Sequence, residues 1–513
     1  MKKTIVFLTG ATGTMGFAGM TEILRYPEQY ELRILARPSK KNKELLSPIL
    51  AKHDNLHIIW GDLTKYEDIL KGVSGADIVL HVGGMVSPQA DYRPKATLRT
   101  NITAAEYITK AVLAQPEDQQ PKVVYIGSVA QMGDRREPLH MGRAGDPICV
   151  SAYDHYGLTK ALAERIITDS GIKTWVSLRQ SGILYPAILK NYDPIMFHVP
   201  IRGVLEWATV EDSGRLLERV CRPEVPKAFW NNYYNIGSGK EYRLSNYEFE
   251  CLLLDAIGCP KPEQIFNANW FTTRNFHGMW YIDGDKLEDF LHFRANVPVK
   301  EYFAQMAKAK SLPAGIKFAA KTHIAKLFPH CVKLAMRKMA NSKEHGTQWW
   351  IKNGERLTVN GERARKRISA YYGSLEAYQA IPDWKHMDLS HNSETPVLLD
   401  HGYDETKDVD KLTDAELNKA AAFRGGKYLG NDTWQDANGN TFKAGRRLIL
   451  LGGHWSPFDM PYPYAHEPKE KQIPWHWDRV AKQNPFFAQL WAPLHDANED
   501  NVYGPEVFEG WEK

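Results

Sequence analysis

Cysteine and long apolar stretches are scarce in this sequence, and each absence limits what the protein can be. The five cysteines are odd in number and scattered, without a Cys-x-x-Cys pair: Cys149, Cys221, Cys251, Cys259 and Cys331. They encode neither a disulfide framework nor a zinc-thiolate site, so no metal site is predicted and a reducing, cytoplasmic location is expected. No apolar run approaches ~20 residues, so no transmembrane helix is predicted. The short apolar run before Gly10 indicates a first strand rather than a signal peptide.

The sequence also lacks a large excess of either positive or negative charge. The formal net charge is only +4 over 513 residues, of which 43% are apolar and 25% are charged. This balance is typical of an ordinary globular protein, and it gives no reason to expect a nucleic-acid partner. The length is sufficient for about two or three domains.

The first 180 residues alternate short apolar runs with segments of helical pattern. Each run has the length of a buried strand, and the six runs are Thr4–Leu8, Glu31–Leu35, Leu56–Trp60, Asp77–His81, Lys122–Ile126 and Thr174–Leu178. Strands separated by helices form right-handed βαβ units. The pattern therefore predicts an α/β domain at residues 1–180, built on a doubly wound parallel sheet. Residues 181–300 are more irregular and aromatic, and we expect a small substrate lobe there, with returns to the first domain.

Acidic residues disappear between Tyr302 and Lys343, where nine Lys or Arg residues occur. Apolar residues recur at helical spacing in this stretch: Phe318, Ile324, Phe328, Val332, Met336 and Met339. Residues 301–344 are therefore predicted to be a linker of one or two basic amphipathic helices. In the first interpretation the linker packs on the body of the protein with its basic face in solvent. In the alternative it binds a membrane surface or another anionic partner.

Residues 345–513 hold nine of the fifteen tryptophans, and they are predicted to form a Trp-rich α+β C-terminal module. The pairs Asn353-Gly354 and Asn360-Gly361 predict tight hairpin turns. The segment Asp436–Asn440 also predicts a hairpin turn, because it carries only half of the ligand spacing of a calcium loop.

A glycine-rich segment, Thr-Gly-Ala-Thr-Gly-Thr-Met-Gly, follows the first predicted strand and opens a helix. Its first glycine permits a tight turn, its second lets the backbone approach a pyrophosphate, and its third lets the helix pack against the sheet. The helix N-terminus offers free N–H groups to phosphates. We therefore predict a dinucleotide-binding loop whose contact residues are Gly10, Thr12, Gly13, Thr14, Met15 and Gly16.

The end of the second strand indicates which dinucleotide binds. A carboxylate there would hydrogen-bond the adenosine ribose of NAD, but this chain has Arg37 followed by Lys40 and Lys41. Because Arg37 can pair with a 2′-phosphate, NADP(H) is predicted in preference to NAD(H), which is the alternative. Arg37 stacked on the adenine without discrimination is the other interpretation of this residue. Further cofactor contacts are predicted after the third and fourth strands: Asp62, Leu63, Val82, Gly83 and Gly84.

Three residues carry the predicted chemistry. Ser128 ends the fifth strand, where its hydroxyl can hold a substrate oxygen. Tyr156 and Lys160 lie four apart and share a helix face. A phenol titrates near ~10, and a neighbouring ammonium favours its ionised form, so Tyr156 is predicted to transfer the proton and Lys160 to tune it. Lys160 can also reach the nicotinamide ribose.

These segments resemble the extended short-chain dehydrogenase/reductase family over about residues 1–300. The matching pieces are the glycine-rich segment of residues 9–16, Gly61–Leu63, Ser128–Gly133, Tyr156–Lys160, Leu178–Pro186 and Tyr234–Gly239. The resemblance implies a Rossmann domain with a small substrate lobe, and a Ser–Tyr–Lys triad. It also implies that Gly182 and Ile183 lie beside the nicotinamide, and that a homodimer can form through the helix of Tyr156.

The C-terminal part resembles a zinc-ribbon or treble-clef module whose cysteines are replaced by Tyr428, Ser456 and Asp459. Without thiolates no structural zinc is expected. His454 near Asp459 could bind a metal, but it is predicted to be a packed or solvated residue. The aromatic residues near Trp475, Trp477 and Trp491 are predicted to belong to a core.

The combined pattern predicts an oxidoreductase that moves hydride between NADP(H) and a ketone or secondary alcohol of a small molecule. The residues after Ser128 lack the acidic pair that the family's dehydratases carry, which favours simple hydride transfer. An NDP-sugar epimerase with tightly bound NAD(P) is the first alternative. A non-catalytic NADP-sensing or scaffold protein is the second.

Overall fold

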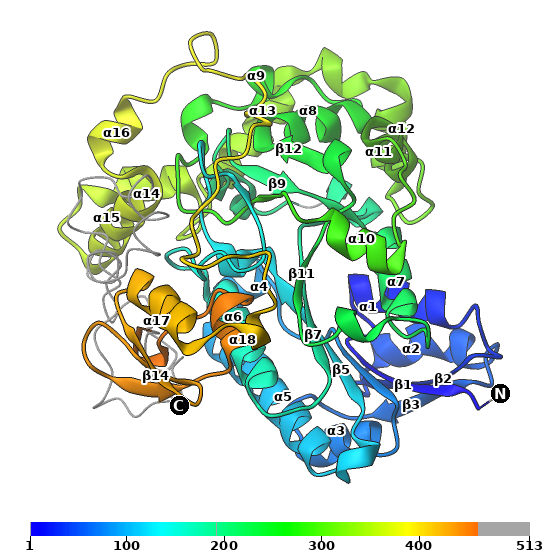
Figure 1. Ribbon diagram of the computed structural model, residues 1–513. Helices are drawn as coiled ribbons and strands as arrows, with labels where there is room; N and C mark the ends of the chain where they lie inside the picture. The colour runs from blue at the N-terminus through cyan, green and yellow to red at the C-terminus, as the bar shows by residue number, and fades with distance from the viewer. Residues whose placement is uncertain (1, 191, 460–513) are drawn as a thin grey trace.

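A seven-stranded parallel sheet lies at the centre of the protein (Figure 1). The structure is a computed structural model and describes residues 2–190 and 192–459. The strand order is β11-β7-β5-β4-β1-β2-β3. The bounds are β1 (Thr4–Thr9), β2 (Tyr30–Ala36), β3 (Leu56–Trp60), β4 (Ile78–His81), β5 (Lys122–Ser128), β7 (Trp175–Gln180) and β11 (Tyr233–Ile236). The predicted doubly wound sheet and its six N-terminal strands are thus confirmed.

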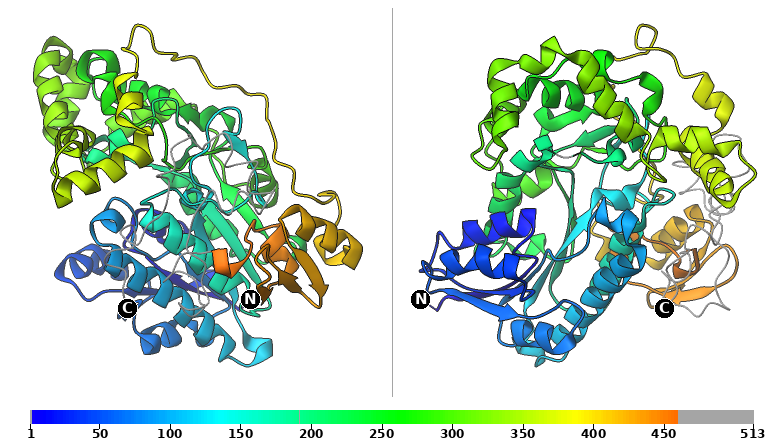
Figure 2. Two further views of the ribbon diagram at one scale, coloured as in Figure 1. Left: turned by 90° about the vertical axis from the view of Figure 1, so that its left-hand side faces the viewer. Right: turned by 180° about the vertical axis from the view of Figure 1, so that it is seen from behind.

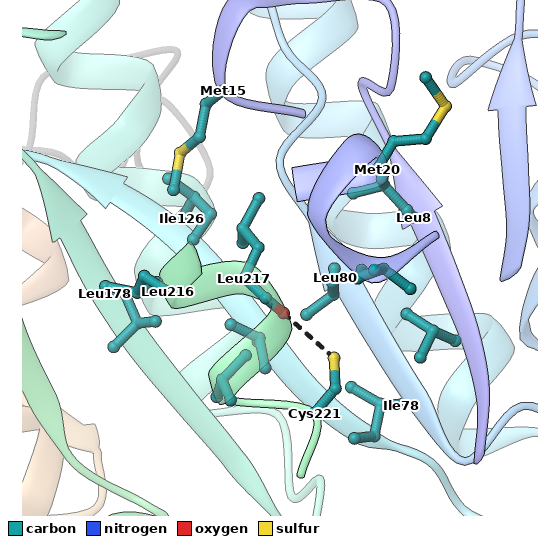
Figure 3. Packing of buried hydrophobic residues seen from close by; sticks show 14 of the residues in the cluster. Leu8, Met15, Met20, Ile78, Leu80, Ile126, Leu178, Leu216, Leu217 and Cys221 are labelled. Carbon is teal, nitrogen blue, oxygen red and sulfur yellow. Dashed lines mark hydrogen bonds between the residues drawn. The ribbon is translucent and has the colours of Figure 1, made fainter. Parts of the chain in front are cut away.

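Helices cover both faces of the sheet, as parallel strands require. One face carries α1 (Thr14–Ile23), α2 (Lys40–Leu50), α7 (Val210–Arg219) and α10 (Asp285–Leu291) over one buried apolar cluster. Figure 3 shows part of this cluster, where Leu216 and Leu217 of α7 lie near Leu80 and Ile126 of the sheet. The other face carries α3 (Tyr66–Val73), α5 (Pro94–Leu113) and α6 (His155–Thr168) over a second cluster.

Most of residues 181–300 form an irregular lobe above the C-terminal ends of the strands, whereas α7, β11 and α10 return to the central sheet (Figure 1). Its short strands pair as β8 (Ile183–Leu184) with β10 (Ala208–Thr209), β9 (Val204–Glu206) with β12 (Arg243–Ser245), and β13 (Trp280–Tyr281) with β6 (Met141–Gly142). Its helices include α8 (Asn246–Ala256) and α9 (Pro262–Ile265). Most of its large aromatic residues are fully buried and build the lobe's core, among them Phe197, Trp270, Phe271 and Trp280.

The basic segment forms three helices rather than the one or two predicted. They are α11 (Val299–Ala307), α12 (Ala314–Thr322) and α13 (Pro329–Ala340). Pro313 and Pro329 stand at the starts of α12 and α13, where a residue without an N–H is tolerated but a continuing helix is not. None of the described helices is both long and apolar enough to cross a membrane.

The C-terminal residues pack in two separate places. The helices α14 (Thr347–Gly354), α15 (Val359–Tyr372) and α16 (Leu375–Gln379) lie against the lobe and share a cluster with Tyr153. Residues 381–408 then run across the surface without helix or strand (Figures 1 and 2). They lead to α17 (Asp414–Phe423), the three-stranded sheet of β14 (Lys427–Gly430), β15 (Thr433–Gln435) and β16 (Thr441–Lys443), and α18 (Arg446–Leu450). From here on, the name C-terminal module denotes only residues 401–459, which are part of the range 345–513 predicted as one module.

The two Asn-Gly hairpin predictions are wrong, because both pairs lie in helices. Asn353 and Gly354 end α14, and Asn360 and Gly361 lie in the first turn of α15. These glycines permit close packing instead: a Cβ on Gly354 would lie 2.6 Å from Ile368 Cδ1, and one on Gly361 would lie 1.9 Å from a backbone oxygen. The third hairpin prediction is confirmed, since residues 436–440 connect the antiparallel strands β15 and β16.

Candidate active site

One cavity of about 780 Å³ lies at the C-terminal ends of the central strands. It brings together every predicted site residue except Lys40: Gly10, Thr12, Gly13, Thr14, Met15, Gly16, Arg37, Asp62, Leu63, Val82, Gly83, Gly84, Ser128, Tyr156, Lys160, Gly182 and Ile183. Lys40 begins α2, is exposed, and pairs with Glu44 at 3.9 Å. Its neighbour Lys41 lines the cavity instead. Lys40 and Lys41 are consecutive residues at the start of α2, and one faces solvent while the other faces the cavity. The sequence alone does not show which of the two faces the cavity.

The glycine-rich loop has the backbone geometry that its sequence predicts. Gly10 has a φ of +76°, and a Cβ there would lie 2.7 Å from the backbone of Gly83. A Cβ on Gly16 would lie 2.2 Å from the carbonyl oxygen of Gly10, so the first turn of α1 packs directly on the loop. Gly13 is the N-cap of α1 and supplies no side-chain cap. The first N–H groups of α1 therefore stay available to a ligand.

The adenosine end of the cavity is basic. Arg37, Ser39, Lys41 and Asn42 line it, and Asp62 is the one carboxylate among the described lining residues. Burial raises the pKa of Asp62, but hydrogen bonds from Thr64 outweigh this and hold the pKa below its ordinary value. Thr64 donates its backbone and side-chain hydrogens to the same oxygen, Oδ1 of Asp62. The other carboxylate oxygen is left to accept from a ligand.

Ser128 and Tyr156, which are predicted to handle the proton, both line the cavity. Ser128 ends β5, is 5% exposed, and accepts the N–H of Ala130 at 3.2 Å. Burial raises the pKa of Tyr156 to about 12, the hydrogen bond with Ser128 opposes the rise, and the charge of Asp154 adds to it. Tyr156 is therefore a protonated phenol in neutral solution.

Lys160 lies one turn from Tyr156 on α6, and its side chain is buried against β5. Its ammonium donates to the carbonyl oxygen of Ile126 and lies 4.3 Å from the ring centre of Tyr125. Burial lowers the pKa of Lys160 to about 7, against the attraction of Glu164. The spacing of four correctly placed both residues at the cavity, but the burial that sets their pKa values comes from packing that the sequence does not display.

Asn101 of α5 positions the loop of Gly83 and Gly84, and the motif search missed it. Its side-chain oxygen accepts the N–H of Met85 at 2.8 Å, and its amide donates to Met85 O and to Thr159 Oγ1. Thr159 lies beside Lys160, so one buried amide connects the loop to the helix that bears Tyr156 and Lys160. No short motif surrounds Asn101, so only the fold reveals its role.

A histidine–carboxylate pair was also missed. His277 lines the same cavity as Tyr156, and its Nδ1 hydrogen-bonds Asp154 Oδ2 at 2.6 Å. Asp154 also caps α6, because its other oxygen accepts the N–H of Gly157 at 2.7 Å. With Nδ1 held, Nε2 is the nitrogen through which His277 can exchange a hydrogen bond or a proton with a ligand. Asp154 could have been recognised as a helix cap, but nothing in the sequence connects it to a residue 123 positions away.

The C-terminal module is fixed to α6 on the side away from the cavity. His454 is buried and donates to Glu164 at 2.8 Å, so it is packed rather than solvated. Arg179 also pairs with Glu164, at 2.6 Å, and donates to the carbonyl of Gly452. Arg165 donates to the carbonyl of Trp455 at 2.6 Å. Because this surface of α6 is covered by the same chain, it is not free for a homodimer.

The positions compared with zinc ligands make ordinary hydrogen bonds. The Tyr428 hydroxyl accepts from the N–H of Asp432 at 3.2 Å, and Ser456 donates to Asp436 at 2.8 Å. Within residues 2–190 and 192–459, no group of three or more His, Cys, Asp or Glu residues could hold a metal ion. The predictions for Trp475, Trp477 and Trp491 lie outside the described residues, as does the side chain of Asp459.

Known proteins match the N-terminal region of the chain. Residues 7–188 match the model of the 3-beta hydroxysteroid dehydrogenase/isomerase family. The 3 beta-hydroxysteroid dehydrogenase type 7 of Mus musculus is 25% identical over 171 residues, which are 33% of this chain and 45% of that protein. Adenylate-forming reductase Nps9 of Serpula lacrymans is 26% identical over 260 residues, with 44% of this chain and 23% of that protein covered. The matches thus span less than half the length of either relative.

Solved structures resemble the chain at lower identity. The UDP-glucose 4-epimerase of Bifidobacterium longum, in complex with NAD+ and UDP, is 17% identical and has a TM-score of 0.46. That comparison covers 63% of this chain and 100% of the epimerase. The dTDP-glucose 4,6-dehydratase of Bacillus anthracis, in complex with NAD, is 15% identical with a TM-score of 0.47, and 63% of this chain and 99% of that chain are covered.

Proposed function

We propose, for a chain whose residues 7–188 are of the extended short-chain dehydrogenase/reductase type, that the protein is an NADP(H)-dependent oxidoreductase. Its reaction is hydride transfer between the nicotinamide and a ketone or secondary alcohol carbon of a small molecule. The observation that carries this proposal is one cavity that contains both the glycine-rich loop and Ser128, Tyr156 and Lys160.

The residues present fit a nicotinamide dinucleotide. Gly10 and Gly83 approach so closely that a Cβ on Gly10 would lie 2.7 Å from the backbone of Gly83, and one on Gly83 would lie 3.0 Å from Gly10 N. The start of α1 offers uncapped N–H groups. The loop of residues 12–15 would hold the diphosphate, and Asp62 the adenine. Gly182 and Ile183 would lie at the nicotinamide, and Lys160 would hold the adjoining ribose. The bound cofactor would supply or accept the hydride.

Arg37 and Lys41 support NADP(H) over NAD(H). Both line the adenosine end of the cavity, and neither forms an ion pair with a carboxylate among the described residues. A 2′-phosphate placed between them would receive charge-assisted hydrogen bonds. The 2′-hydroxyl of NAD(H) carries no charge and would interact much more weakly with these two cations.

The protonation of Tyr156 favours carbonyl reduction, because in that direction the residue must begin as a proton donor. The phenol gives its proton to the substrate oxygen as negative charge develops there, and Ser128 hydrogen-bonds the same oxygen. Burial keeps the phenol protonated before the reaction, because it raises the pKa of Tyr156 to about 12. In the oxidation direction a positive charge near Tyr156 is needed to favour the phenolate.

An apolar ring compound suits the substrate end of the cavity. That end is lined by Tyr185, Ile195, Leu205 and Phe276, with His277 as its polar member. The names of the matched family and of the mouse relative refer to a hydroxysteroid, which is a secondary alcohol on a fused ring. We therefore place apolar cyclic ketones and alcohols first among the substrates.

The test is a screen of cyclic, aromatic and aliphatic carbonyl compounds with NADPH, followed at the nicotinamide absorbance band. We expect stoichiometric loss of NADPH with at least one apolar ketone, and none with the Tyr156→Phe variant. A protein that purifies with bound cofactor and interconverts sugar-nucleotide isomers without added NADPH would instead be an epimerase. NADPH binding without turnover of any compound would indicate the sensor alternative.

A further inference from the structure

The basic helical segment exposes large apolar side chains. Five of them lie between residues 318 and 334, and their exposed fractions are 56% for Phe318, 39% for Ile324, 74% for Leu327, 55% for Phe328 and 68% for Leu334. Scattered exposed apolar residues need no explanation, but five within seventeen consecutive positions form a concentrated set. We call these five residues the apolar edge.

The apolar edge is surrounded by positive charge. The segment from residue 302 to residue 343 has no carboxylate, and its cations are Lys308, Lys310, Lys317, Lys321, Lys326, Lys333, Arg337, Lys338 and Lys343. Lys326 pairs with Asp255 and Lys343 with Glu344. For the other seven, the described part of the chain places no carboxylate within salt-bridge distance. The surface therefore combines exposed apolar groups with cations that are free to bind an anion.

The opposite side of the segment is firmly packed, so the apolar edge is not simply a loosely docked core. Met339 is 2% exposed, and Val332 and Met336 pack into the lobe's core beside Phe197 and Trp270. Tyr192 donates its hydroxyl to the carbonyl of Ala335 at 2.6 Å. The helix α13 thus packs one face against the protein and presents another outward.

We propose that residues 314–338 bind the surface of a membrane that contains anionic phospholipids. The apolar edge enters the boundary between headgroups and acyl chains, and the surrounding Lys and Arg residues contact the anionic headgroups. Charge complementarity favours this partner over a neutral apolar surface. The concentration of exposed apolar residues favours it over a nucleic acid, whose binding is dominated by its charged phosphates. No described helix can cross a membrane, so the contact is peripheral.

The same segment lies beside the substrate end of the cavity. α13 contacts residues 192–196, and Ile195 of this stretch lines the cavity. Val86 lines the cavity and is 54% exposed, and Tyr92 donates to Asp193 at 2.9 Å. A membrane held at α12 and α13 therefore places acyl chains near the residues through which an apolar substrate would enter. This last step rests on the proposed function, whereas membrane binding itself does not.

The test measures sedimentation of the full chain with lipid vesicles, without cofactor or substrate. The vesicles contain phosphatidylcholine alone or with roughly a third of phosphatidylserine. We expect the partition coefficient to be at least about 100-fold higher with phosphatidylserine and to fall as salt is added. Lys321→Gln combined with Lys338→Gln should lower it by about 30-fold, and Leu327→Ser combined with Leu334→Ser by at least about tenfold.

Matched controls distinguish this surface from general stickiness. Leu357→Ser with Val359→Ser alters side chains that are 97% and 69% exposed elsewhere, and Lys52→Gln with Lys419→Gln removes two other exposed cations. Both control pairs should bind vesicles as the unaltered chain does. Thermal unfolding of each variant verifies that it is folded, and NADPH titration without vesicles reports the proposed function separately.

Three results would overturn the proposal. The first is equal or absent binding to both vesicle compositions. The second is strong binding to duplex DNA that the lysine variant loses and the leucine variant keeps, which would indicate a nucleic-acid surface. The third is a concentration-dependent dimer that the leucine variant abolishes while vesicle binding is absent, which would make a second copy of this chain the partner.

Discussion

The polar groups on the two sides of helix α6 differ in how completely they are hydrogen-bonded by the protein. On the cavity side, the Tyr156 hydroxyl is hydrogen-bonded to Ser128, and the uncapped start of α1 and Arg37 line the cavity. On the far side, Glu164 is fully buried and is hydrogen-bonded by Arg179, Ser177 and His454. A second closed set joins Arg135, Asp146 and His401.

This difference in hydrogen bonding distinguishes a site that can bind a ligand from a surface that attaches one part of the chain to another. Polar groups left with unused hydrogen-bonding capacity are available to a ligand, and their cost is repaid when it binds. Buried charges whose partners are all present fix one arrangement of the chain, and removing one partner leaves the others uncompensated. The cavity side therefore has the properties of a ligand site. The far side has those of a permanent joint to the C-terminal module.

The largest effect is expected on the cavity side, from Tyr156→Phe. Loss of a proton donor should lower kcat by roughly 100- to 10,000-fold, whereas the Kd for NADPH and the unfolding midpoint should change little. Steady-state kinetics with the ketone found in the screen, together with NADPH titration, measure this. A variant that retained most of kcat would remove Tyr156 from the proton-transfer role.

Glu164→Gln should have the largest effect on the far side. Arg179 would lose its charged partner in a buried site, and we expect the free energy of unfolding to fall by about 3–5 kcal/mol. Urea unfolding followed by fluorescence measures this value, with Glu106→Gln on the exposed face of α5 as the control. If the loss were below about 1 kcal/mol, the joint would not depend on the ion pair.

Arg37→Gln should change which cofactor the cavity prefers. Loss of a charge-assisted hydrogen bond to a 2′-phosphate is expected to raise the Kd for NADPH by about 10- to 100-fold and to leave the Kd for NADH nearly unchanged. Arg25→Gln, an exposed change near the end of α1, is the control. Equal effects on both cofactors would support the stacking interpretation of Arg37.

Acid should weaken the far side of α6 through His454. Burial lowers the pKa of His454 to about 4, below the ~6.5 of an unfolded histidine. The unfolded chain therefore binds a proton that the folded chain refuses, and stability present above about pH 6.5 is lost as the pH falls toward 4. We expect a loss of about 2 kcal/mol over this range, measured by urea unfolding at several pH values.

The variant His454→Gln should flatten that dependence, and His57→Gln at an exposed site should not. An unchanged slope in His454→Gln would assign the acid sensitivity to other groups. Glu164 acts in the same direction, because its pKa is also held below its ordinary value and its contribution is lost at still lower pH.

The smallest effect is expected from His277→Gln. The pair with Asp154 would be lost from the cavity, and we expect kcat/KM to fall by about tenfold, with a change in the shape of the pH–rate profile. Asp154→Asn should reproduce the changed profile and also weaken the cap of α6 by about 1 kcal/mol. A uniform fall in rate at every pH would indicate that His277 only shapes the cavity.

The parts of the fold and of the site that could be predicted are those that depend on local sequence patterns. The buried parallel strands had to be continuous apolar runs, so six strands were located correctly from the sequence. The glycine-rich loop was equally predictable, because Gly10 adopts a positive φ that other residues avoid. The basic helices were found, but the breaks at Pro313 and Pro329 were underestimated.

Predictions that depended on distant neighbours were less successful. The Asn-Gly pairs of residues 353–354 and 360–361 have the composition of hairpin turns, yet the flanking residues are helical and the glycines serve packing between α14 and α15. Lys40 and Lys41 are equally basic, and only the start of α2 decides which of them faces the cavity. Asn101 and His277 lie in no motif at all.

The sequence by itself determined the order of the strands along the chain, the phosphate-binding loop and the spacing of Tyr156 and Lys160, because each depends on residues close together in the chain. The tertiary structure alone decided the pKa values of these two residues, the pairing of His277 with Asp154, and the coverage of α6 by the C-terminal module. It also decided which apolar side chains of residues 318–334 remain exposed. Burial and pairing across hundreds of positions arise from packing, and no local pattern records them.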